Sequence, residues 1–407
     1  MKIKKECRLC NSPNREIIDL GNSPPANNFI SKTQTTVESF PLIVDFCDQC
    51  GGFQLRHCLE KEQLYSHYTY LTPDTVSLND HYENIVNYLT DNKYITKEMD
   101  CLEIGSNNGR FLKFLEPYVK SVLGVDPAEN VASIAKSLGI ETIVDFFSKD
   151  VIHKIKNKDR KIQLIVARHM FAHNPNPNEI FEGINSLLDE KGVILIENQY
   201  VFDTLQTGAF DQIYHEHMFY YSVKNMQNYL NSHAYDLNDI FFSDIHGGSI
   251  VFIGSRRNQY PVSKNVKDQI TWENKLLDND KILNKFRNRV GDIKTMALKE
   301  INKDIREGKR VCAYGAPAKA FTMFSLLGLD NSKINFCVDT SATKVGKYFP
   351  VFNIPVVSED QMISMEYDTF LVTAWNYKTD ILSRSSKLFK ANTKLIFPLP
   401  DFEILYT

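Results

Sequence analysis

Residues 100–126 decide the fold of this chain: they read DCLEIGSNNG at 100–109, RFLKFL at 110–115 and VLGVD at 122–126. This order predicts a buried strand, a tight turn at Gly105 and Gly109, a short amphipathic helix and a second strand that ends in Asp126. In open α/β sheets such a turn stands at a helix N-terminus, and the acid marks the carboxyl end of the next strand. Nucleotide-like ligands bind at that edge of the sheet.

The glycine spacing indicates which ligand the turn holds. The dinucleotide fingerprint needs three glycines, but only Gly105 and Gly109 stand in this turn. An acid before the turn and Asp126 after it suit a ligand with a ribose and no pyrophosphate, so S-adenosylmethionine is the expected cofactor. Asp126 is expected to hold the two ribose hydroxyls with its carboxylate oxygens. The expected cofactor contacts of this unit are Glu103, Gly105, Ser106, Asn107, Gly109 and Asp126.

The alternation of strands and helices continues after this unit. Strands are expected at 142–147, 162–167 and 193–197, and helices near 127–132 and over 178–188. This pattern predicts a doubly wound, Rossmann-like α/β sheet. Asp145 is expected to accept a hydrogen bond from the adenine amino group while Phe146 or Phe147 covers the ring. The alternative for the two phenylalanines is the plain core, and we expect one of each.

The composition is that of a globular protein with more than one domain. The chain has 407 residues, a formal net charge of -3 and eight cysteines. Its apolar runs are too short to span a bilayer and no apolar signal core follows its first residues, so we expect a cytoplasmic protein with no membrane association. The nearly balanced charge argues against a nucleic-acid partner. Cysteines without an export signal are expected to be thiols or metal ligands.

Two Cys-x-x-Cys knuckles stand near the N-terminus, and they consist of Cys7, Cys10, Cys47 and Cys50. Four thiolates in two such pairs fit a closed tetrahedral zinc site, which is structural because no position remains open for a reactant. The alternatives are two unrelated buried pairs or a redox site. The doubled knuckle favours zinc over both.

The second chemical signal is the sequence DQIYHEH at 211–217. His215 and His217 beside Glu216 could form a second metal site, but no third ligand at suitable spacing accompanies them. Alternatively, one histidine is a general base, because imidazole titrates near neutrality. His169 and His173 are expected in the neighbouring loop. Tyr65, Tyr68 and Tyr70, which are crowded ahead of a predicted helix, either pack a domain junction or line a pocket.

A second βα pattern begins after a long charged, helical stretch. Gly315 follows a predicted strand at 310–314 and precedes a predicted helix at 318–324, whose N-terminus, with Lys319, is a candidate phosphate site. Two more strands are expected at 334–339 and 369–374. The predicted division is a zinc module at 1–66, an S-adenosylmethionine-binding α/β domain at 67–263, a helical connector at 264–308 and a smaller Rossmann-like domain at 309–407.

The order of these motifs resembles one enzyme family. The motifs are the doubled knuckle, E-x-G-S-N-x-G at 103–109, V-D-F-F at 144–147, Y-H-E-H at 214–217, H-G-G-S at 246–249 and Y-G-A-x-x-K at 314–319. Together they are similar to those of the sugar C-methyltransferases that act on nucleotide-linked 4-keto-6-deoxyhexoses. The similarity covers essentially the whole chain. It implies a class I methyltransferase domain flanked by the zinc module and the second Rossmann-like domain, with a nucleotide-diphosphate sugar bound between them.

The resemblance also implies roles for individual residues. His217 would be the base, Tyr214 and Glu216 its companions, and His173 and Tyr68 contacts of the keto and hydroxyl groups of the sugar. Methylation of a carbon beside a ketone needs such a base and a donor for the enolate oxygen. Two alternatives stay open: methylation at oxygen or nitrogen of a related nucleotide sugar, or a non-catalytic, zinc-bearing protein that binds sugar nucleotides.

Overall fold

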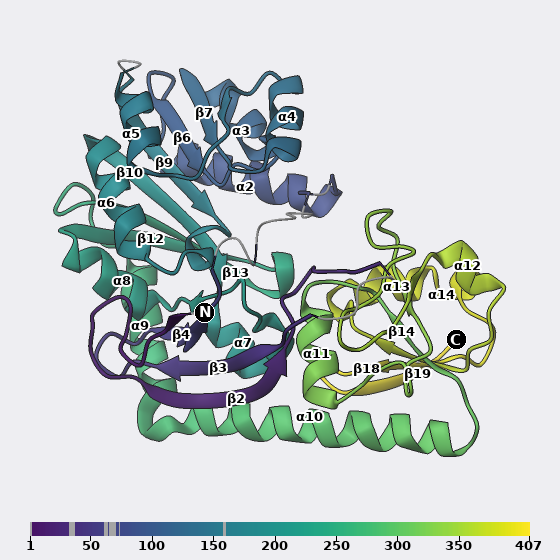
Figure 1. Ribbon diagram of the computed structural model, residues 1–407. Coiled ribbons are helices and arrows are strands. Elements are labelled where there is room, and N and C mark those ends of the chain that lie inside the picture. Colours follow the sequence, from purple (N-terminus) through teal and green to yellow (C-terminus); the bar gives the residue numbers. More distant parts are fainter. Residues whose placement is uncertain (1, 32–36, 61–63, 65–70, 73, 158–159) are drawn as a thin grey trace.

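The computed structural model describes residues 2–31, 37–60, 64, 71–72, 74–157 and 160–407. In these ranges the strands form four sheets, and the long helix α10 (Lys281–Arg306) runs along the base of the molecule beneath two of them (Figure 1). Tyr65, Tyr68 and Tyr70 lie outside the described residues, so the expected substrate contact of Tyr68 stays a prediction. None of the helices within these ranges combines the length and the apolar character needed to cross a bilayer.

The largest sheet has seven strands in the order β12-β13-β10-β9-β6-β7-β8. Only β13 is antiparallel to its neighbours, and the order reverses between β6 and β9. In a sheet of this kind the crevice at the reversal, outside the carboxyl ends of the strands, is the ligand site. The strands are β6 (Asp100–Ile104), β7 (Ser121–Val125), β8 (Thr142–Ile143), β9 (Ile162–Arg168), β10 (Leu188–Gln199), β12 (Tyr235–Ser243) and β13 (Ser249–Arg256).

Helices cover both faces of this sheet, as the predicted doubly wound fold requires. Neighbouring strand residues point to opposite faces, so Cys101 packs in one hydrophobic cluster with residues of α2 and α3, and Leu102 in another with residues of α5 and α6. The strand expected at 142–147 is shorter than predicted, because only Thr142–Ile143 pair with β7. The helices are α2 (Val76–Asp91), α3 (Arg110–Leu115), α4 (Glu129–Ser137), α5 (Lys149–Lys156), α6 (Pro177–Leu187), α7 (Val201–Thr207) and α8 (Val223–Ser232).

The N-terminal sheet is completed by a strand from the middle of the chain. Its order is β11-β4-β3-β2, and β11 (Phe219–Tyr220) comes directly after the 211–217 sequence. The segment that carries His217 is therefore tied by backbone hydrogen bonds to the N-terminal part. The other strands are β2 (Arg15–Ser23), β3 (Phe40–Phe46) and β4 (Phe53–Leu55), and β1 (Lys2–Ile3) pairs with β5 (His57–Cys58) in a small sheet of their own.

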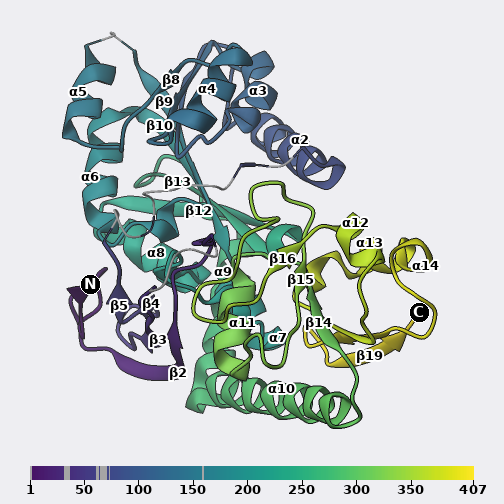
Figure 2. The ribbon, with the colours of Figure 1, turned by 45° about the vertical axis from the view of Figure 1, so that its right-hand side comes forward.

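The C-terminal sheet repeats the Rossmann-like order on a smaller scale. Its order is β16-β15-β14-β17-β18-β19, with β19 antiparallel to β18. Figure 2 labels β14, β15, β16 and β19 of this sheet, together with α10 and α11. Gly315 follows β14 with φ +94°, and a Cβ at this position would lie 2.4 Å from Cβ of Ala374, so glycine is needed there. The elements are β14 (Val311–Tyr314), α11 (Lys319–Leu327), β15 (Cys337–Val338), β16 (Val356–Val357), α12 (Glu359–Ile363), β17 (Thr369–Val372), α13 (Lys378–Ser383), α14 (Ser385–Leu388), β18 (Lys394–Phe397) and β19 (Glu403–Tyr406).

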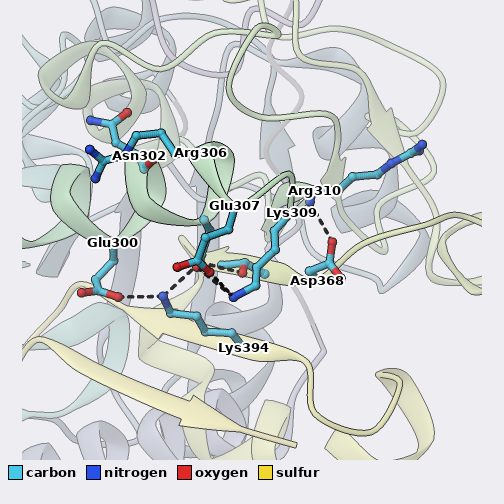
Figure 3. Close-up of polar contacts among 10 residues, drawn as sticks. Glu300, Asn302, Arg306, Glu307, Lys309, Arg310, Asp368 and Lys394 are labelled. Carbon is cyan, nitrogen blue, oxygen red and sulfur yellow. Dashed lines mark hydrogen bonds and ion pairs between the residues drawn. The ribbon is translucent and has the colours of Figure 1, made fainter.

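A polar cluster fixes the end of α10 to this sheet (Figure 3). Nζ of Lys394, a side chain that is 6% exposed, lies 2.7 Å from Oε2 of Glu300 and 3.0 Å from Oδ2 of Asp304. The hydroxyl of Thr369 donates to the same Asp304 oxygen at 2.8 Å. Burial disfavours the charge on Asp304, but the bonds from Lys394 and Thr369 outweigh it and hold its pKa below the ordinary value. The helical connector, which begins with α9 (Lys264–Leu277), is thus attached to the C-terminal sheet through α10.

We predict that Lys394→Met lowers the free energy of unfolding by about 3 kcal/mol, because it leaves Asp304 buried without its main charge partner. Urea denaturation followed by circular dichroism measures the change. The matched control is Lys309→Met, because Nζ of Lys309 also faces Asp304, at 3.5 Å, but is 43% exposed. Equal losses in the two variants would contradict the role given to Lys394.

Candidate active site and zinc site

The four expected cysteines converge on one point. Their sulfur atoms all lie within 4.8 Å of one another, with Cys7 Sγ 3.6 Å from Cys50 Sγ and Cys10 Sγ 3.5 Å from Cys47 Sγ. Such a set of sulfurs fits a tetrahedral zinc ion. Each knuckle closes a tight turn, because the amides of Asn11 and Gly51 donate to the carbonyls of Cys7 and Cys47.

A residue of helix α8, which lies beside the large sheet, supports this zinc site. Nδ2 of Asn225, in α8, donates to Sγ of Cys50 at 3.5 Å and to its carbonyl at 3.3 Å. Amide donors of this kind stabilise thiolate ligands and orient them. Sequence reasoning missed Asn225 because it lies 175 positions from Cys50 and belongs to no motif.

The glycine turn after β6 has the expected shape. Gly105 and Gly109 have φ of +73° and +70°, and added Cβ atoms would lie 2.7 Å from Cγ of Met170 and 2.9 Å from Cβ of Ala135. Both glycines are therefore needed for conformation and for space. Gly109 is the N-cap of α3, so the helix N-terminus faces the turn as the sequence indicates.

Asp126 lies beside this turn and orients it. Its Oδ2 accepts from the amide of Asn107 at 2.8 Å and its Oδ1 from the amide of Ala128 at 2.9 Å. Burial raises the pKa of Asp126, and these two backbone bonds oppose the shift. Each carboxylate oxygen keeps a lone pair beyond these bonds, so the expected contact with ribose hydroxyls stays compatible with the geometry.

The turn is also connected to the segment before α2. The Thr72 amide donates to Oδ1 of Asn107 at 3.0 Å, and Nδ2 of Asn108 donates to the Thr72 carbonyl at 2.9 Å. Asn107 and Asn108 therefore hold the chain that enters α2 against the cofactor turn.

A buried charged cluster underlies the turn. Glu103 is fully buried, and its Oε1 accepts from Nε of Arg168 at 2.9 Å. The Arg168 guanidinium lies over the rings of Tyr82 and Phe111 at 4.4 and 4.2 Å. Burial raises the pKa of Glu103 to about 7, although Arg168 opposes the shift. Arg168, which ends β9, is thus a partner of Glu103, a role that sequence reasoning did not assign to it.

Several buried polar atoms at the carboxyl edge of the sheet fit a polar ligand. Within the described residues, Glu103 Oε2, Ser106 Oγ and both amide atoms of Asn198 have no hydrogen-bond partner. Buried polar groups are nearly always paired, so these unpartnered atoms at the carboxyl edge of the sheet fit a bound polar group. The ammonium, carboxylate and ribose hydroxyls of S-adenosylmethionine match such donors and acceptors.

The residues expected around the adenine diverge. Asp145 accepts from the Phe146 amide at 2.8 Å and lies 3.4 Å from Nζ of Lys154. Phe146 is 43% exposed, whereas Phe147 packs against the core, where its ring fills the space beside Gly183. Their contacts with the cofactor stay predictions.

The 211–217 loop fixes the state of His217. Nδ1 of His217 lies 3.1 Å from the carbonyl oxygen of Gln212, and Nε2 lies 2.6 Å from the hydroxyl of Tyr214. A carbonyl only accepts, so Nδ1 carries the proton and Nε2 is the acceptor. Burial holds the pKa of His217 well below its ordinary value, and His173 adds to the shift. His217 is therefore a neutral imidazole whose Nε2 is the acceptor nitrogen.

The neighbours of His217 play different parts. Nε2 of His215 bonds to the Phe40 carbonyl at 3.2 Å, so the two histidines of the pair have separate partners and do not converge on one metal. Glu216 accepts from Nδ2 of Asn27 at 3.2 Å, and burial raises its pKa to about 7. Asn27, from the N-terminal part, has a positive φ of 59° and was not predicted as a site residue.

Contacts connect His217 with the glycine turn. Met170 packs against Gly105 and begins the turn that carries His173, whose ring centroid lies 5.0 Å from that of His217. Burial, with a smaller contribution from His169, lowers the pKa of His173 to about 4, so its ring is neutral. The expected base and the expected cofactor turn thus stand at the same edge of the sheet.

Strand order, glycine turn and four-cysteine site define a class I, S-adenosylmethionine-dependent methyltransferase that carries zinc. Family models match three consecutive parts of the chain: "Putative zinc binding domain" at 7–65, "Methyltransferase domain" at 78–240 and "C-methyltransferase C-terminal domain" at 244–400. The chain is 30% identical over 405 residues to the C-methyltransferase NovU of Streptomyces niveus. The alignment covers 98% of this chain and 96% of NovU. The chain belongs to this C-methyltransferase family.

Two solved bacterial structures have a weak likeness to parts of this chain. YcgJ of Bacillus subtilis is 12% identical, with a TM-score of 0.34, and covers 44% of this chain and 99% of its own. The magnesium protoporphyrin IX methyltransferase ChlM of Synechocystis, solved with S-adenosylmethionine, is 10% identical, with a TM-score of 0.34, and covers 44% of this chain and 80% of its own. The full-length family match favours carbon methylation over the oxygen or nitrogen alternative and over the non-catalytic one.

We predict that Cys47→Ser lowers both the zinc content and the melting temperature, because binding of a structural zinc ion contributes to folding. Metal analysis by mass spectrometry and thermal melting measure the two effects. Cys312→Ser is the control, since Cys312 is also buried but lies outside the cluster. A variant at position 47 that keeps its zinc and its melting profile would overturn the assignment.

We predict that Asp126→Asn weakens binding of S-adenosylhomocysteine by about 10-fold to 100-fold, the worth of a charge-assisted hydrogen bond. Isothermal titration calorimetry measures the affinity. Asp100→Asn is the matched control, because Asp100 is also a buried acid of this sheet but stands at the opposite, amino end of β6. Unchanged affinity in Asp126→Asn would contradict the ribose assignment.

Proposed function

We propose that this C-methyltransferase methylates the carbon beside the ketone of a nucleoside-diphosphate-linked 4-keto-6-deoxy sugar. The motifs quoted above, whose order resembles that of enzymes with this substrate class, support the proposal. The observation that carries it is the neutral His217, whose Nδ1 proton is committed to a backbone carbonyl while Nε2 is an acceptor. A carbon acid needs such a base, because the α-proton does not leave spontaneously at neutral pH.

His217 and Tyr214 act together in the proposed proton transfer. The 2.6 Å bond between the Tyr214 hydroxyl and Nε2 keeps the tyrosine proton directed at the imidazole. In the proposed step the Tyr214 hydroxyl takes the α-proton of the sugar while its own proton moves to Nε2 of His217. Glu216, with a pKa of about 7, and Tyr214 complete the polar surroundings of the base.

His173 is the proposed donor to the enolate oxygen. Because its pKa of about 4 leaves the ring neutral near pH 7, it offers one N–H group without a competing positive charge. A neutral donor held in a buried site stabilises negative charge that develops on a carbonyl oxygen. Tyr68 stays a second candidate for the sugar contact.

The cofactor is proposed to lie along the glycine turn, held by Gly105, Ser106, Asn107, Gly109 and Asp126. S-adenosylmethionine supplies an electrophilic methyl group when it is bound. Glu103 and Asn198, with buried polar atoms that lack protein partners, are the candidate contacts of its amino-acid end. The division at 1–66, 67–263, 264–308 and 309–407 is proposed for the domains, with β11 as the strand that links the second segment to the first.

We predict that His217→Ala abolishes methyl transfer, while its affinity for S-adenosylhomocysteine stays within about twofold, because the imidazole acts in proton transfer. The assay incubates nucleoside-diphosphate 4-keto-6-deoxyhexoses with the enzyme in D2O and follows deuterium entry beside the ketone by mass spectrometry. Exchange is expected in the wild-type protein and absent in the variant.

His215→Asn is the matched control for this experiment. His215 belongs to the same sequence motif, but its ring is bonded to the Phe40 carbonyl, so its loss should lower stability and leave exchange in the folded protein. Exchange that persists in His217→Ala would disprove the role of His217. Methyl transfer to a hydroxyl of the sugar, without exchange, would disprove the proposed reaction.

A further inference from the structure

The C-terminal part of the chain grips the loop that carries the base. Nε1 of Trp375 donates to Oδ2 of Asp211 at 2.6 Å, and the hydroxyl of Thr322, in α11, donates to the Ile213 carbonyl at 2.6 Å. Asp211 is fully buried and Trp375 is 7% exposed. Two side chains from more than 100 positions away thus bind the residues on either side of Gln212.

A buried lysine balances the charge of Asp211. Nζ of Lys319 lies over the Trp375 ring, 3.9 Å from its centroid, and donates to Oδ1 of Asn376 at 2.7 Å. Burial raises the pKa of Asp211, and Lys319 and the Trp375 bond oppose the shift. Burial likewise lowers the pKa of Lys319 to about 8. A buried, ionised Asp211 without these partners would cost folding free energy. The position of Asp211 therefore depends on Trp375 and Lys319. Lys319, expected to hold a phosphate, is turned toward this cluster instead.

Gln212 connects these C-terminal contacts with His217. Its carbonyl is the acceptor of His217 Nδ1, and its side chain is clamped from two sides. Nε2 of Gln199 donates to Oε1 of Gln212 at 2.6 Å, while Nε2 of Gln212 donates to the His246 carbonyl at 2.9 Å. Gly247, next to His246, leaves room for both Gln212 and Trp375, because a Cβ there would lie 2.8 Å from Nε2 of Gln212 and 3.3 Å from Cη2 of Trp375.

We propose that Asp211 and Trp375 are positioning residues for His217. Their hydrogen bond fixes the turn at 210–212, η3 (Phe210–Gln212), so that the Gln212 carbonyl faces Nδ1 of the imidazole. The inference rests on the proposed role of His217 as the base. It adds that the C-terminal Rossmann-like part sets which nitrogen of that base is the proton acceptor, although it supplies no atom to the proton transfer.

The consequence is visible in the tautomer of one histidine. In water a neutral histidine prefers the proton on Nε2, whereas this loop requires it on Nδ1. The hydrogen bond that one ring nitrogen makes decides which tautomer is present. If the Gln212 carbonyl moves away, His217 returns toward the form with the proton on Nε2, and Nε2 no longer accepts the proton of the Tyr214 hydroxyl.

The test is ¹⁵N nuclear magnetic resonance of protein labelled at its histidine rings, with the His217 signals assigned from the His217→Ala spectrum. Wild-type protein should show Nδ1–H for His217. Trp375→Phe removes the N–H donor and keeps an aromatic ring, so a substantial population of His217 with Nε2–H is expected. The matched control is Trp272→Phe, the same change at the other tryptophan of the chain, which is 37% exposed and packs on Phe202.

Variants of Asp211 provide an independent arm. Asp211→Leu removes the acceptor, keeps the branched shape of the side chain and should reproduce the tautomer change. Adding Trp375→Phe to it should cause no further change, because both substitutions act through one bond. Asp211→Asn keeps an acceptor oxygen for Trp375 and should retain Nδ1–H. Calorimetric titration with S-adenosylhomocysteine should give wild-type affinity in every folded variant.

The outcomes separate this inference from the proposed function. A wild-type tautomer in both Trp375→Phe and Asp211→Leu, or an equal change in Trp272→Phe, overturns the positioning role. Because the measurement needs no sugar, it stands whether or not the 4-keto sugar is the substrate. Conversely, failure of the deuterium exchange assay would sink the proposed reaction and leave the tautomer result intact.

Discussion

In the proposed mechanism, the chemistry of this protein depends on the hydrogen bond from Nδ1 of His217 to the Gln212 carbonyl. It exists because a loop of a few residues is bound by three parts of the chain at once. Asn27 and the Phe40 carbonyl hold it from the N-terminal part, Gln199 from the central sheet, and Trp375 with Thr322 from the C-terminal part. The flanking parts are therefore supports of the active site as well as neighbours of it.

Burial shapes the acid–base behaviour of the whole site. His173 and His217 have lowered pKa values and Glu103 and Glu216 raised ones, and desolvation is the largest cause in all four. Because the imidazoles are neutral, each ring offers one donor and one acceptor nitrogen. In the proposed mechanism, the site thus relies on uncharged groups held in place.

The zinc site and α10 attach the flanking parts of the chain to the central part. Asn225, in α8, is bonded to the cysteine cluster, and β11 joins the N-terminal sheet two residues after His217. At the other side, Lys394 and Asp304 attach α10 to the C-terminal sheet. Rigid attachment at both ends keeps the parts that grip the base loop in register.

The sequence by itself determined the elements whose signals are local. Glycine spacing predicted the turn at Gly105 and Gly109, where the positive φ and the close neighbours require glycine. The paired knuckles predicted the four-cysteine site. Only the tertiary structure decided which partner each side chain meets: Arg168 beneath Glu103, Asn225 at Cys50, and Trp375 at Asp211. Those contacts join residues 65, 175 and 164 positions apart, and no local pattern encodes them because they arise only when separate sheets pack together.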